Sequence, residues 1–393
     1  MKVGILTFHS SYNFGANLQA LAVQEILRSK GCQPVVIDYR DPWKEEMLRS
    51  KVPSAQAEVH ETFVRRYLDT SPRFRCDKEV REYCDDHLDV IAVGSDQVFR
   101  LLSRWDPKLL FRRLCGAKPS SSWTQVDDHL PVYYLPWPKN GSAGPRRVAI
   151  AACAVGMSYF FLGKPLRREA RRSLSDFDFI SVRDNWTRIV VMWLSRGRAR
   201  PVLCPDPVFA LNDYFSIPQD EIPDIDTSRA IMVAAPFDKA WLEEFRKLSH
   251  DRGLMVGHLP DTTGATTSDD GDVTINLPLS PLAWYSLLSK AAGYVGSRFH
   301  GLVSCVANHT PVVTVDWSNW PRLMRWATRT YDLCQKAGAT NRCMPVNWLA
   351  HPSPTALMRN LMEGSSQAAM NQYAEQAKAR VAHVIGESIA HLV

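Results

Sequence analysis

The first 39 residues contain the pattern of a strand, a helix and a second strand. Residues 3–8 are a short apolar run typical of a buried strand, and apolar residues then recur at helical spacing over 18–27, before Gly31. Residues 34–39 form a second apolar run. Because two strands joined by a crossover helix pair in parallel, we expect the chain to begin with a βαβ unit of a parallel sheet.

The rest of the chain repeats this alternation in two series. We predict strands at 88–94, 147–156, 177–184, 229–236, 253–257, 293–296 and 311–316, and helices at 164–175, 239–252, 281–292, 302–308 and over most of 354–393. Residues 113–146 are rich in Pro, Ser, Gly and Lys and are predicted to be irregular. A length of 393 residues fits two domains, which we place at 1–200 and 201–350, followed by a helical tail at 351–393.

The composition excludes several classes of protein. With 45% hydrophobic and 22% charged residues the chain is globular, and no apolar run reaches the length of a membrane span. The apolar run at the N-terminus is too short for a signal peptide, so we expect a cytoplasmic protein. Nine scattered cysteines without paired spacing argue against a disulfide framework and against zinc. A net charge of +6 suits anionic small molecules or an anionic membrane face, and we expect no nucleic-acid partner.

Polar residues follow four of the predicted strands. They are residues 9–13 with Gly15, residues 94–96, Arg183 with Asp184, and residues 297–300. Ligands bind at the carboxyl ends of the strands in open α/β sheets. These turns are therefore the candidate site.

The turn at 297–300 has the most specific chemistry. It opens a predicted helix, whose N-terminus attracts anions, and Arg298 adds a planar fork for carboxylate or phosphate. His300 can exchange a proton near neutral pH, and Ser297 can cap the helix. A capped helix with a purely structural histidine explains the turn equally well.

The other turns also have structural explanations. Arg183 could form a surface ion pair with Asp184, and Asp96 could cap a helix that begins near Gln97. The basic segment 164–172 is more often a solvated helix face than a binding site, although it could contact anionic lipid head groups or a diphosphate.

Five segments together resemble the polysaccharide pyruvyl transferase family. They are GILTFHSSYNFGANLQALAVQEILRSKG (4–31), DVIAVGSDQVF (89–99), VAIAACAVG (148–156), FDFISVRDN (177–185) with CPDPVFAL (204–211), and AGYVGSRFHGLVSCVANHTPVVTVD (292–316). They occur in the family's order and extend over residues 1 to 320. Residues 113–146 lie outside the shared pattern, which leaves the acceptor open.

The resemblance implies an α/β fold with two Rossmann-like domains that face each other across a cleft, as in GT-B glycosyltransferases. It implies transfer of the pyruvyl group of phosphoenolpyruvate to two hydroxyls of a sugar in a surface polysaccharide or its precursor, giving a pyruvate ketal and phosphate. Phosphoenolpyruvate is then a co-substrate, and no metal or other cofactor is expected. The acceptor could be a lipid-linked oligosaccharide at the inner face of the membrane, a nucleotide sugar or a free glycan.

The resemblance, together with the chemistry of the reaction and the place of each turn, divides the candidate residues between donor and acceptor. Arg183, Arg298 and Ser297 are expected to hold phosphoenolpyruvate, with His300 as the acid or as stabiliser of the leaving phosphate. Asp96 is expected to be the base at the acceptor hydroxyl. The acceptor side is expected to include His9, Asn13, Gly15 and Ser95.

Two other functions remain open at this point. A GT-B-like glycosyltransferase with a nucleotide-sugar donor would share the architecture and would need an acidic residue for the ribose, such as Asp261. A catalytically silent subunit of a polysaccharide assembly complex would not need Arg183, Arg298, His300 and Asp96 together.

Overall fold

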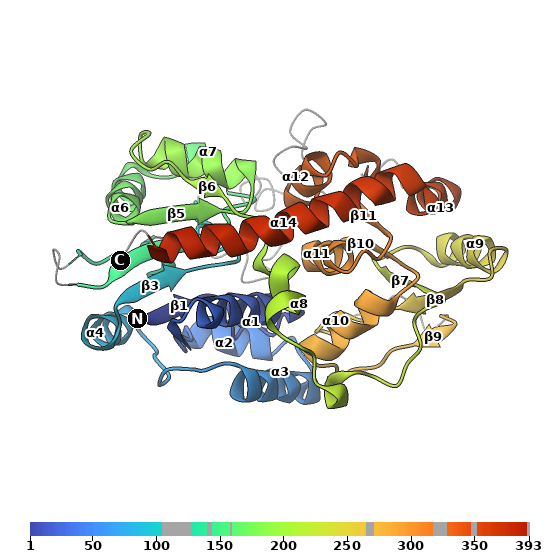
Figure 1. Ribbon diagram of the computed structural model, residues 1–393, viewed down its shortest axis with the longest axis horizontal. Helices are drawn as coiled ribbons and strands as arrows, with labels where there is room; N and C mark the ends of the chain where they lie inside the picture. The colour runs from blue at the N-terminus through green and yellow to red at the C-terminus, as the bar shows by residue number, and fades with distance from the viewer. Residues whose placement is uncertain are drawn as a thin grey trace, which may run out of the picture.

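The computed structural model describes residues 1–103, 128–139, 144–157, 159–264, 271–316, 328–346 and 352–390. These residues form two six-stranded sheets, each parallel throughout and flanked by helices (Figure 1). The apolar strand runs are buried, as is typical of parallel sheets covered by helices. The expected α/β, GT-B-like, two-domain architecture is therefore present.

The N-terminal domain is built on the first sheet, in the strand order β2-β1-β3-β4-β5-β6. Its strands are β1 (Lys2–Leu6), β2 (Gln33–Val36), β3 (Val90–Val93), β4 (Arg146–Ala152), β5 (Phe179–Val182) and β6 (Val202–Leu203). Its helices are α1 (Phe14–Ser29), α2 (Pro42–Arg49), α3 (Ser54–Tyr67), α4 (Asp77–His87), α6 (Lys164–Ser175) and α7 (Asn185–Leu194). Since β6 pairs with β5, the first sheet continues just past the predicted boundary at residue 200.

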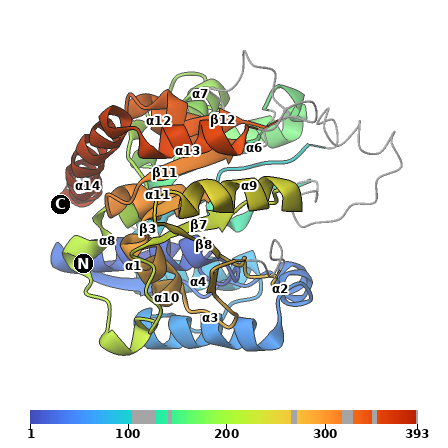
Figure 2. The ribbon, with the colours of Figure 1, turned by 90° about the vertical axis from the view of Figure 1, so that its right-hand side faces the viewer.

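The C-terminal domain repeats this plan, in the strand order β12-β11-β10-β7-β8-β9. Its strands are β7 (Ala230–Ala234), β8 (Met255–His258), β9 (Val273–Thr274), β10 (Gly293–Gly296), β11 (Val312–Asp316) and β12 (Cys343–Pro345). Its helices are α9 (Lys239–His250), α10 (Pro281–Lys290), α11 (Phe299–Ala307), α12 (Arg329–Lys336) and α13 (Pro354–Met362), with α9 and α13 side by side (Figure 2).

Two segments connect the domains. The short helix α8 (Leu211–Tyr214) lies against α1 after the first sheet. The last helix, α14 (Gly364–Ala390), begins near the C-terminal domain and crosses to the N-terminal one, where it contacts α1, β4 and β5 (Figure 1). Within the predicted tail at 351–393, the described residues 352–390 are thus packed against both domains.

Side-chain contacts also fix the domains against each other. The amide of Gln56 in α3 exchanges two hydrogen bonds with the backbone of Leu279, at 2.8 and 2.7 Å, and all these groups are buried. Phe14, the first residue of α1, stacks on Trp284 of α10 with ring centroids 5.3 Å apart. Buried amide–backbone pairs and stacked rings are directional, so they set the relative position of the two sheets.

Candidate active site between the domains

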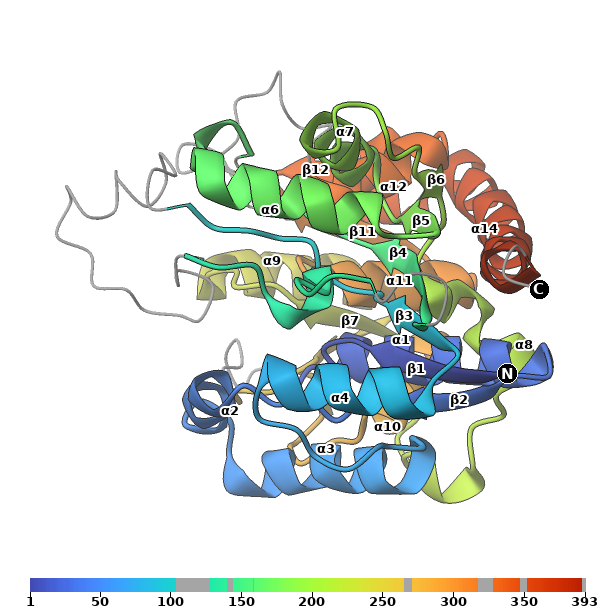
Figure 3. The same cartoon turned by 90° about the vertical axis from the view of Figure 1, so that its left-hand side faces the viewer.

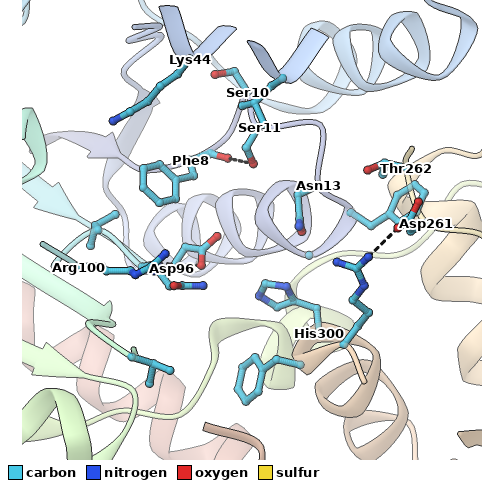
Figure 4. A pocket seen from close by; sticks show the side chains of 18 of the residues that line it. Phe8, Ser10, Ser11, Asn13, Lys44, Asp96, Arg100, Asp261, Thr262 and His300 are labelled. Carbon is cyan, nitrogen blue, oxygen red and sulfur yellow. Dashed lines mark hydrogen bonds and ion pairs between the residues drawn. The ribbon is translucent and has the colours of Figure 1, made fainter. Parts of the chain in front are cut away.

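A cavity of about 820 Å³ lies between the two domains. The N-terminal domain contributes the turn after β1, the start of α2 and the turn after β3. The C-terminal domain contributes residues 234–236, residues 259–262 and the start of α11. Figure 4 shows His300, Asn13 and Asp96 reaching into this space from different elements. The cavity therefore lies at the carboxyl ends of strands from both sheets, where open α/β sheets bind their ligands.

The start of α11 forms the wall on the C-terminal side. The N-cap of this helix is Arg298, which makes no side-chain capping bond, so the prediction that Ser297 caps the helix is wrong. Ser297, Arg298 and His300 all line the cavity. The open N–H groups of the first turn and the helix dipole make this wall attractive to an anion.

Arg298 is held at the edge of the cavity. Its side chain is 60% exposed, and its Nη2 donates to Oδ2 of Asp261 at 2.6 Å (Figure 4). A guanidinium has five N–H donors, so this contact leaves further donors for a ligand. Asp261 lies on the same wall and fixes the direction of the arginine.

His300 is largely enclosed, with 12% of its side chain exposed, and its surroundings are positively charged. Burial, and then the charges of Arg183 and Arg329, lower the pKa of its imidazole well below the ordinary value. The ring is therefore neutral at pH 7 in the free protein. Its Nε2 lies 3.9 Å from Oδ2 of Asp206 and has no hydrogen-bond partner in the described structure.

Gly15 allows His300 to occupy this position. A Cβ atom at residue 15 would lie 1.9 Å from Cγ and 2.1 Å from Nδ1 of His300, much closer than atoms can approach. The sequence predicts Gly15 on the acceptor side, whereas in the structure its direct contact is His300 of the other domain. Only glycine permits such a close approach of backbone and side chain.

Arg183 lies behind the cavity wall and does not line the cavity. It is 4% exposed, and its Nη1 donates to Oδ2 of Asp206 at 2.7 Å, while Nη2 lies 3.8 Å from Asp96. The alternative of a surface pair with Asp184 is wrong, because the arginine is buried and pairs elsewhere. Asp206 also accepts a bond of 2.5 Å from Gln19 of α1, so its carboxylate links the end of β5 to α1.

Asp96 faces the cavity from the turn after β3. Its φ is 75°, a left-handed conformation that a few residues such as Asp tolerate, and its Oδ1 accepts from the backbone of Gln97 at 2.8 Å. No α-helix begins at Gln97, so the explanation of Asp96 as a helix cap is wrong.

Of the residues predicted in the turn after β1, some lie at the cavity and others lie in the core. Asn13 lines the cavity and also caps α1 by accepting from the backbone of Ala16 at 3.2 Å. His9 is fully buried and bonds to Asp38 at 3.0 Å, so it belongs to the core. Ser95 is also fully buried and does not line the cavity. The structure thus places His9 and Ser95 behind the cavity surface, away from the predicted acceptor position.

The comparison with known families identifies the chain. A sequence model described as polysaccharide pyruvyl transferase matches residues 13–319. The chain belongs to this family. A search of curated proteins gave no match.

Solved structures with a related fold are very distant in sequence. A putative UDP-N-acetylglucosamine 2-epimerase from Listeria monocytogenes is 8% identical, with a TM-score of 0.50 over 94% of this chain and 90% of the other. The Neisseria meningitidis UDP-GlcNAc 2-epimerase is 10% identical, with a TM-score of 0.48 over 99% and 100%. The calicheamicin glycosyltransferase CalG4 is 10% identical, with a TM-score of 0.46 over 100% and 98%. The first of these supports the GT-B-like fold of this pyruvyl transferase family member and nothing beyond it.

Several charged residues of the cavity were not predicted from the sequence, and Arg329 lies nearest to the α11 wall among them. It is the first residue of α12, and its guanidinium lies 4.9 Å from the ring of Phe299. Burial lowers the pKa of its guanidinium, and the positive charge of Arg183 lowers it further. The amide of Gln97 lies 3.2 Å away, but no carboxylate of the described residues forms an ion pair with it. A single arginine far along the chain carries no local signal that could have revealed this.

Two aromatic residues of the cavity were also missed. Phe8 and Tyr133 meet edge to face with centroids 4.7 Å apart, and both line the cavity. Tyr133 lies within the predicted irregular segment 113–146, of which residues 128–139 and 144–146 are described. The segment outside the family pattern thus contributes directly to the site.

Three general features of the described residues bear on function. They contain no group of three or more His, Cys, Asp or Glu placed to hold a metal ion. The eight cysteines among them are free, and Cys115 lies outside the described residues. In the same part of the chain, no helix combines the length and apolarity needed to cross a bilayer.

Proposed function

We propose that this protein transfers the pyruvyl group of phosphoenolpyruvate to two hydroxyls of a sugar, in a surface polysaccharide or its precursor. The observation that carries the proposal is the wall formed by the start of α11, where Arg298, the neutral His300 and nearby Arg329 surround one cavity. The family supports a pyruvyl transferase acting in polysaccharide synthesis. The donor and the ketal chemistry are the proposed part.

The charges on this wall match the proposed donor. Phosphoenolpyruvate carries a carboxylate and a phosphate in a small volume. Arg329 is charged and has no carboxylate partner among the described residues, and Arg298 has donors to spare. A guanidinium binds either group with two parallel hydrogen bonds, and the α11 N-terminus offers backbone N–H groups beside them. Arg183 lies behind the cavity wall, where it binds Asp206 and its positive charge lowers the pKa of His300.

The reaction requires two additions at the same carbon. A proton is added to the methylene carbon, and the first sugar hydroxyl attacks the adjacent cationic carbon and loses its own proton. The carbon–oxygen bond to phosphate then breaks, and the second hydroxyl attacks the new cation, its proton leaving with the phosphate. One proton is taken up and two are released, so the products are the ketal and hydrogen phosphate.

His300 and Asp96 are the groups placed for these proton transfers. We assign His300 to protonation of the methylene carbon or to stabilisation of the leaving phosphate, once the bound anion has made its protonation favourable. Asp96 faces the cavity from the opposite domain and is assigned as base for the acceptor hydroxyl. Phosphoenolpyruvate serves as co-substrate, and the mechanism uses no metal or other cofactor.

The acceptor is placed on the N-terminal side of the cavity. Phe8 and Tyr133 provide an apolar surface for a sugar ring, and Asn13 can bond to a hydroxyl. The enzyme is then cytoplasmic, and a lipid-linked acceptor would bring it to the inner face of the membrane. The alternative, a nucleotide-sugar glycosyltransferase, needs an acidic residue free for ribose, but Asp261 is engaged by Arg298.

One assay separates these functions. The protein is incubated with phosphoenolpyruvate and a panel of sugars, and phosphate release is followed together with the product mass. A mass gain of one pyruvate ketal supports the proposal, whereas turnover with a nucleotide sugar alone and a gain of one hexose overturns it. Arg298→Ala and His300→Ala should abolish turnover while circular dichroism stays unchanged, and near wild-type rates in either variant would remove that residue from the mechanism.

A further inference from the structure

A group of large apolar side chains is exposed on the N-terminal domain, outside the cavity. Phe160 is 64% exposed, Phe161 43%, Met192 43%, Ile189 38% and Trp193 36%. The two phenylalanines lie in the short helix Tyr159–Phe161, and the others share one face of α7. Tyr159 holds the group together through its ring contacts with Phe160 and Trp193, with centroids at 4.1 and 4.8 Å. Soluble monomers rarely expose so many large apolar residues in one place without a partner.

Basic side chains surround this group. The neighbouring helix α6 carries Lys164 and four arginines (167, 168, 171 and 172) against one acidic residue, Glu169. After α7 come Arg196, Arg198 and Arg200, all exposed. Within the described part of the chain, none of these side chains forms an ion pair with a carboxylate. We call the exposed apolar group and these basic residues the α6–α7 surface.

The two kinds of side chain are in contact with each other. Helices α6 and α7 pack together, and Figure 3 shows them side by side at the outer edge of the domain. The guanidinium of Arg167 lies 5.7 Å from the ring of Trp193. Desolvation lowers the pKa of the Arg171 guanidinium, and the positive charges of Arg196 and Arg198 lower it further. The surface thus concentrates uncompensated positive charge around protruding aromatic rings.

We propose that the α6–α7 surface docks the protein on an anionic lipid bilayer. Aromatic and aliphatic side chains enter the boundary between head groups and acyl chains, while arginines and lysines bind the anionic head groups. Charge complementarity favours this partner over a second copy of the chain, because two identical surfaces would oppose like charges.

The surface adjoins the cavity described above. The hydroxyl of Ser103 donates to the backbone oxygen of Phe161 at 2.6 Å, and the preceding residue, Leu102, lines the cavity. Docking would therefore hold the N-terminal side of the cavity close to the bilayer. If the proposed function is correct, this position suits a sugar acceptor carried on a membrane lipid, and that part of the inference rests on the proposed function.

Binding is tested without any assumption about activity. The purified full-length protein is mixed with vesicles of phosphatidylcholine alone, or of phosphatidylcholine with phosphatidylglycerol, and the bound fraction is measured by flotation at low and at high salt. We expect binding to the anionic vesicles only, with a loss at high salt. Arg168→Glu/Arg172→Glu should lower the partition coefficient at least tenfold, since one basic residue near such a surface contributes about fivefold. Phe160→Ser/Phe161→Ser should also lower it at least about tenfold, because it removes two large apolar side chains from the bilayer boundary.

Matched variants elsewhere serve as controls. Lys239→Glu/Lys247→Glu changes the same charge on the exposed face of α9, and Met362→Ala removes another exposed apolar residue. Both should bind anionic vesicles as the wild type does. Equal loss in the α9 variant, equal binding to neutral vesicles, or a dimer in solution that the Phe160→Ser/Phe161→Ser variant abolishes would each overturn the proposal.

Activity is measured separately with a soluble acceptor in the absence of vesicles. The α6–α7 variants should keep full turnover there, because their residues lie outside the cavity. Vesicle binding without any turnover would refute the proposed function and leave the docking surface intact. Turnover without vesicle binding would refute the docking surface alone.

Discussion

Replacing Gly15 with alanine tests whether the position of His300 decides activity. The structure places the new Cβ atom 1.9 Å from Cγ of His300, whereas real Cβ atoms stay at least 3.0 Å from such neighbours. The ring must therefore move by at least 1.1 Å, the difference between these two distances. Alanine itself fits the backbone, because φ at residue 15 is not in the left-handed region.

The displacement should affect catalysis far more than folding. A shift of about 1 Å in a reacting group can lower the rate about 100-fold. Overpacking costs about 1–3 kcal/mol, and the better helix propensity of alanine near the start of α1 offsets up to about 1 kcal/mol of it. We therefore expect a loss of kcat of about two orders of magnitude and a fall in the free energy of unfolding of no more than about 2 kcal/mol.

The assay combines phosphate release from phosphoenolpyruvate with urea unfolding. Gly386→Ala is the matched control, since its Cβ would meet only Cε of Lys30, at 3.7 Å. This control lies within α14 and should keep full activity with a gain of up to about 1 kcal/mol in stability. In a His300→Asn background, Gly15→Ala should have little further effect on rate. Turnover of Gly15→Ala within about twofold of wild type would refute the steric argument.

Further variants test Arg329 of the cavity, the ion pair behind the cavity wall and a buried histidine of α3. Arg329→Ala should weaken binding of phosphoenolpyruvate at least tenfold, because a charged hydrogen bond contributes about 1.5–3 kcal/mol. Arg329→Lys should recover part of this affinity. Unchanged affinity of Arg329→Ala in calorimetric titration would remove Arg329 from the donor site. Asp206→Asn should lower the free energy of unfolding by about 3–5 kcal/mol, since Arg183 loses its buried charged partner. In urea unfolding, the double variant Arg183→Met/Asp206→Leu should recover most of the lost stability. Burial lowers the pKa of His60 to about 4, so below pH 6.5 the unfolded chain binds a proton that the folded one does not. Stability should therefore fall by about 1.4 kcal/mol per pH unit towards pH 4, and His60→Gln should lack this part of the slope in urea unfolding; an identical slope in both proteins would contradict the assignment.

Local patterns were sufficient to predict most of the fold. The helix at 164–175 has the predicted bounds, and the strands at β7, β10 and β11 lie within the predicted segments. These features depend on the spacing of apolar residues and on short-range capping signals, which the sequence contains directly. The edge strand β12 escaped prediction because three residues are too few to show a period.

The candidate site depends on contacts between distant segments, and there the sequence was less informative. The turn after β1 could be placed at the cleft, but its spacing could not show that Asn13 faces the cavity while His9 bonds to Asp38. Nor could it show that Gly15 makes room for a side chain 285 residues further along the chain. Arg329 had no neighbouring motif at all. Polar residues after strands predict where a site lies, and only the packing of the domains decides which of them are exposed in it.

The protonation of His300 provides a direct test of the proposed mechanism. In the free protein, burial and the charges of Arg183 and Arg329 keep the imidazole neutral. A bound phosphoenolpyruvate would add negative charge beside the ring. One such charge at about 4 Å contributes roughly 4 kcal/mol in a medium of effective dielectric constant about 20, equivalent to a pKa increase of about three units.

We therefore expect the donor itself to make His300 a usable acid. In NMR titrations with labelled histidine, the His300 resonance should remain that of a neutral ring below pH 6 in the free protein. Saturation with phosphoenolpyruvate should raise its pKa by more than one unit, whereas the resonance of His309, which lies on the surface beside Glu375, should not change. If the donor binds and the pKa of His300 does not rise, the histidine cannot supply the proton, and its contribution must be limited to a hydrogen bond from the neutral ring.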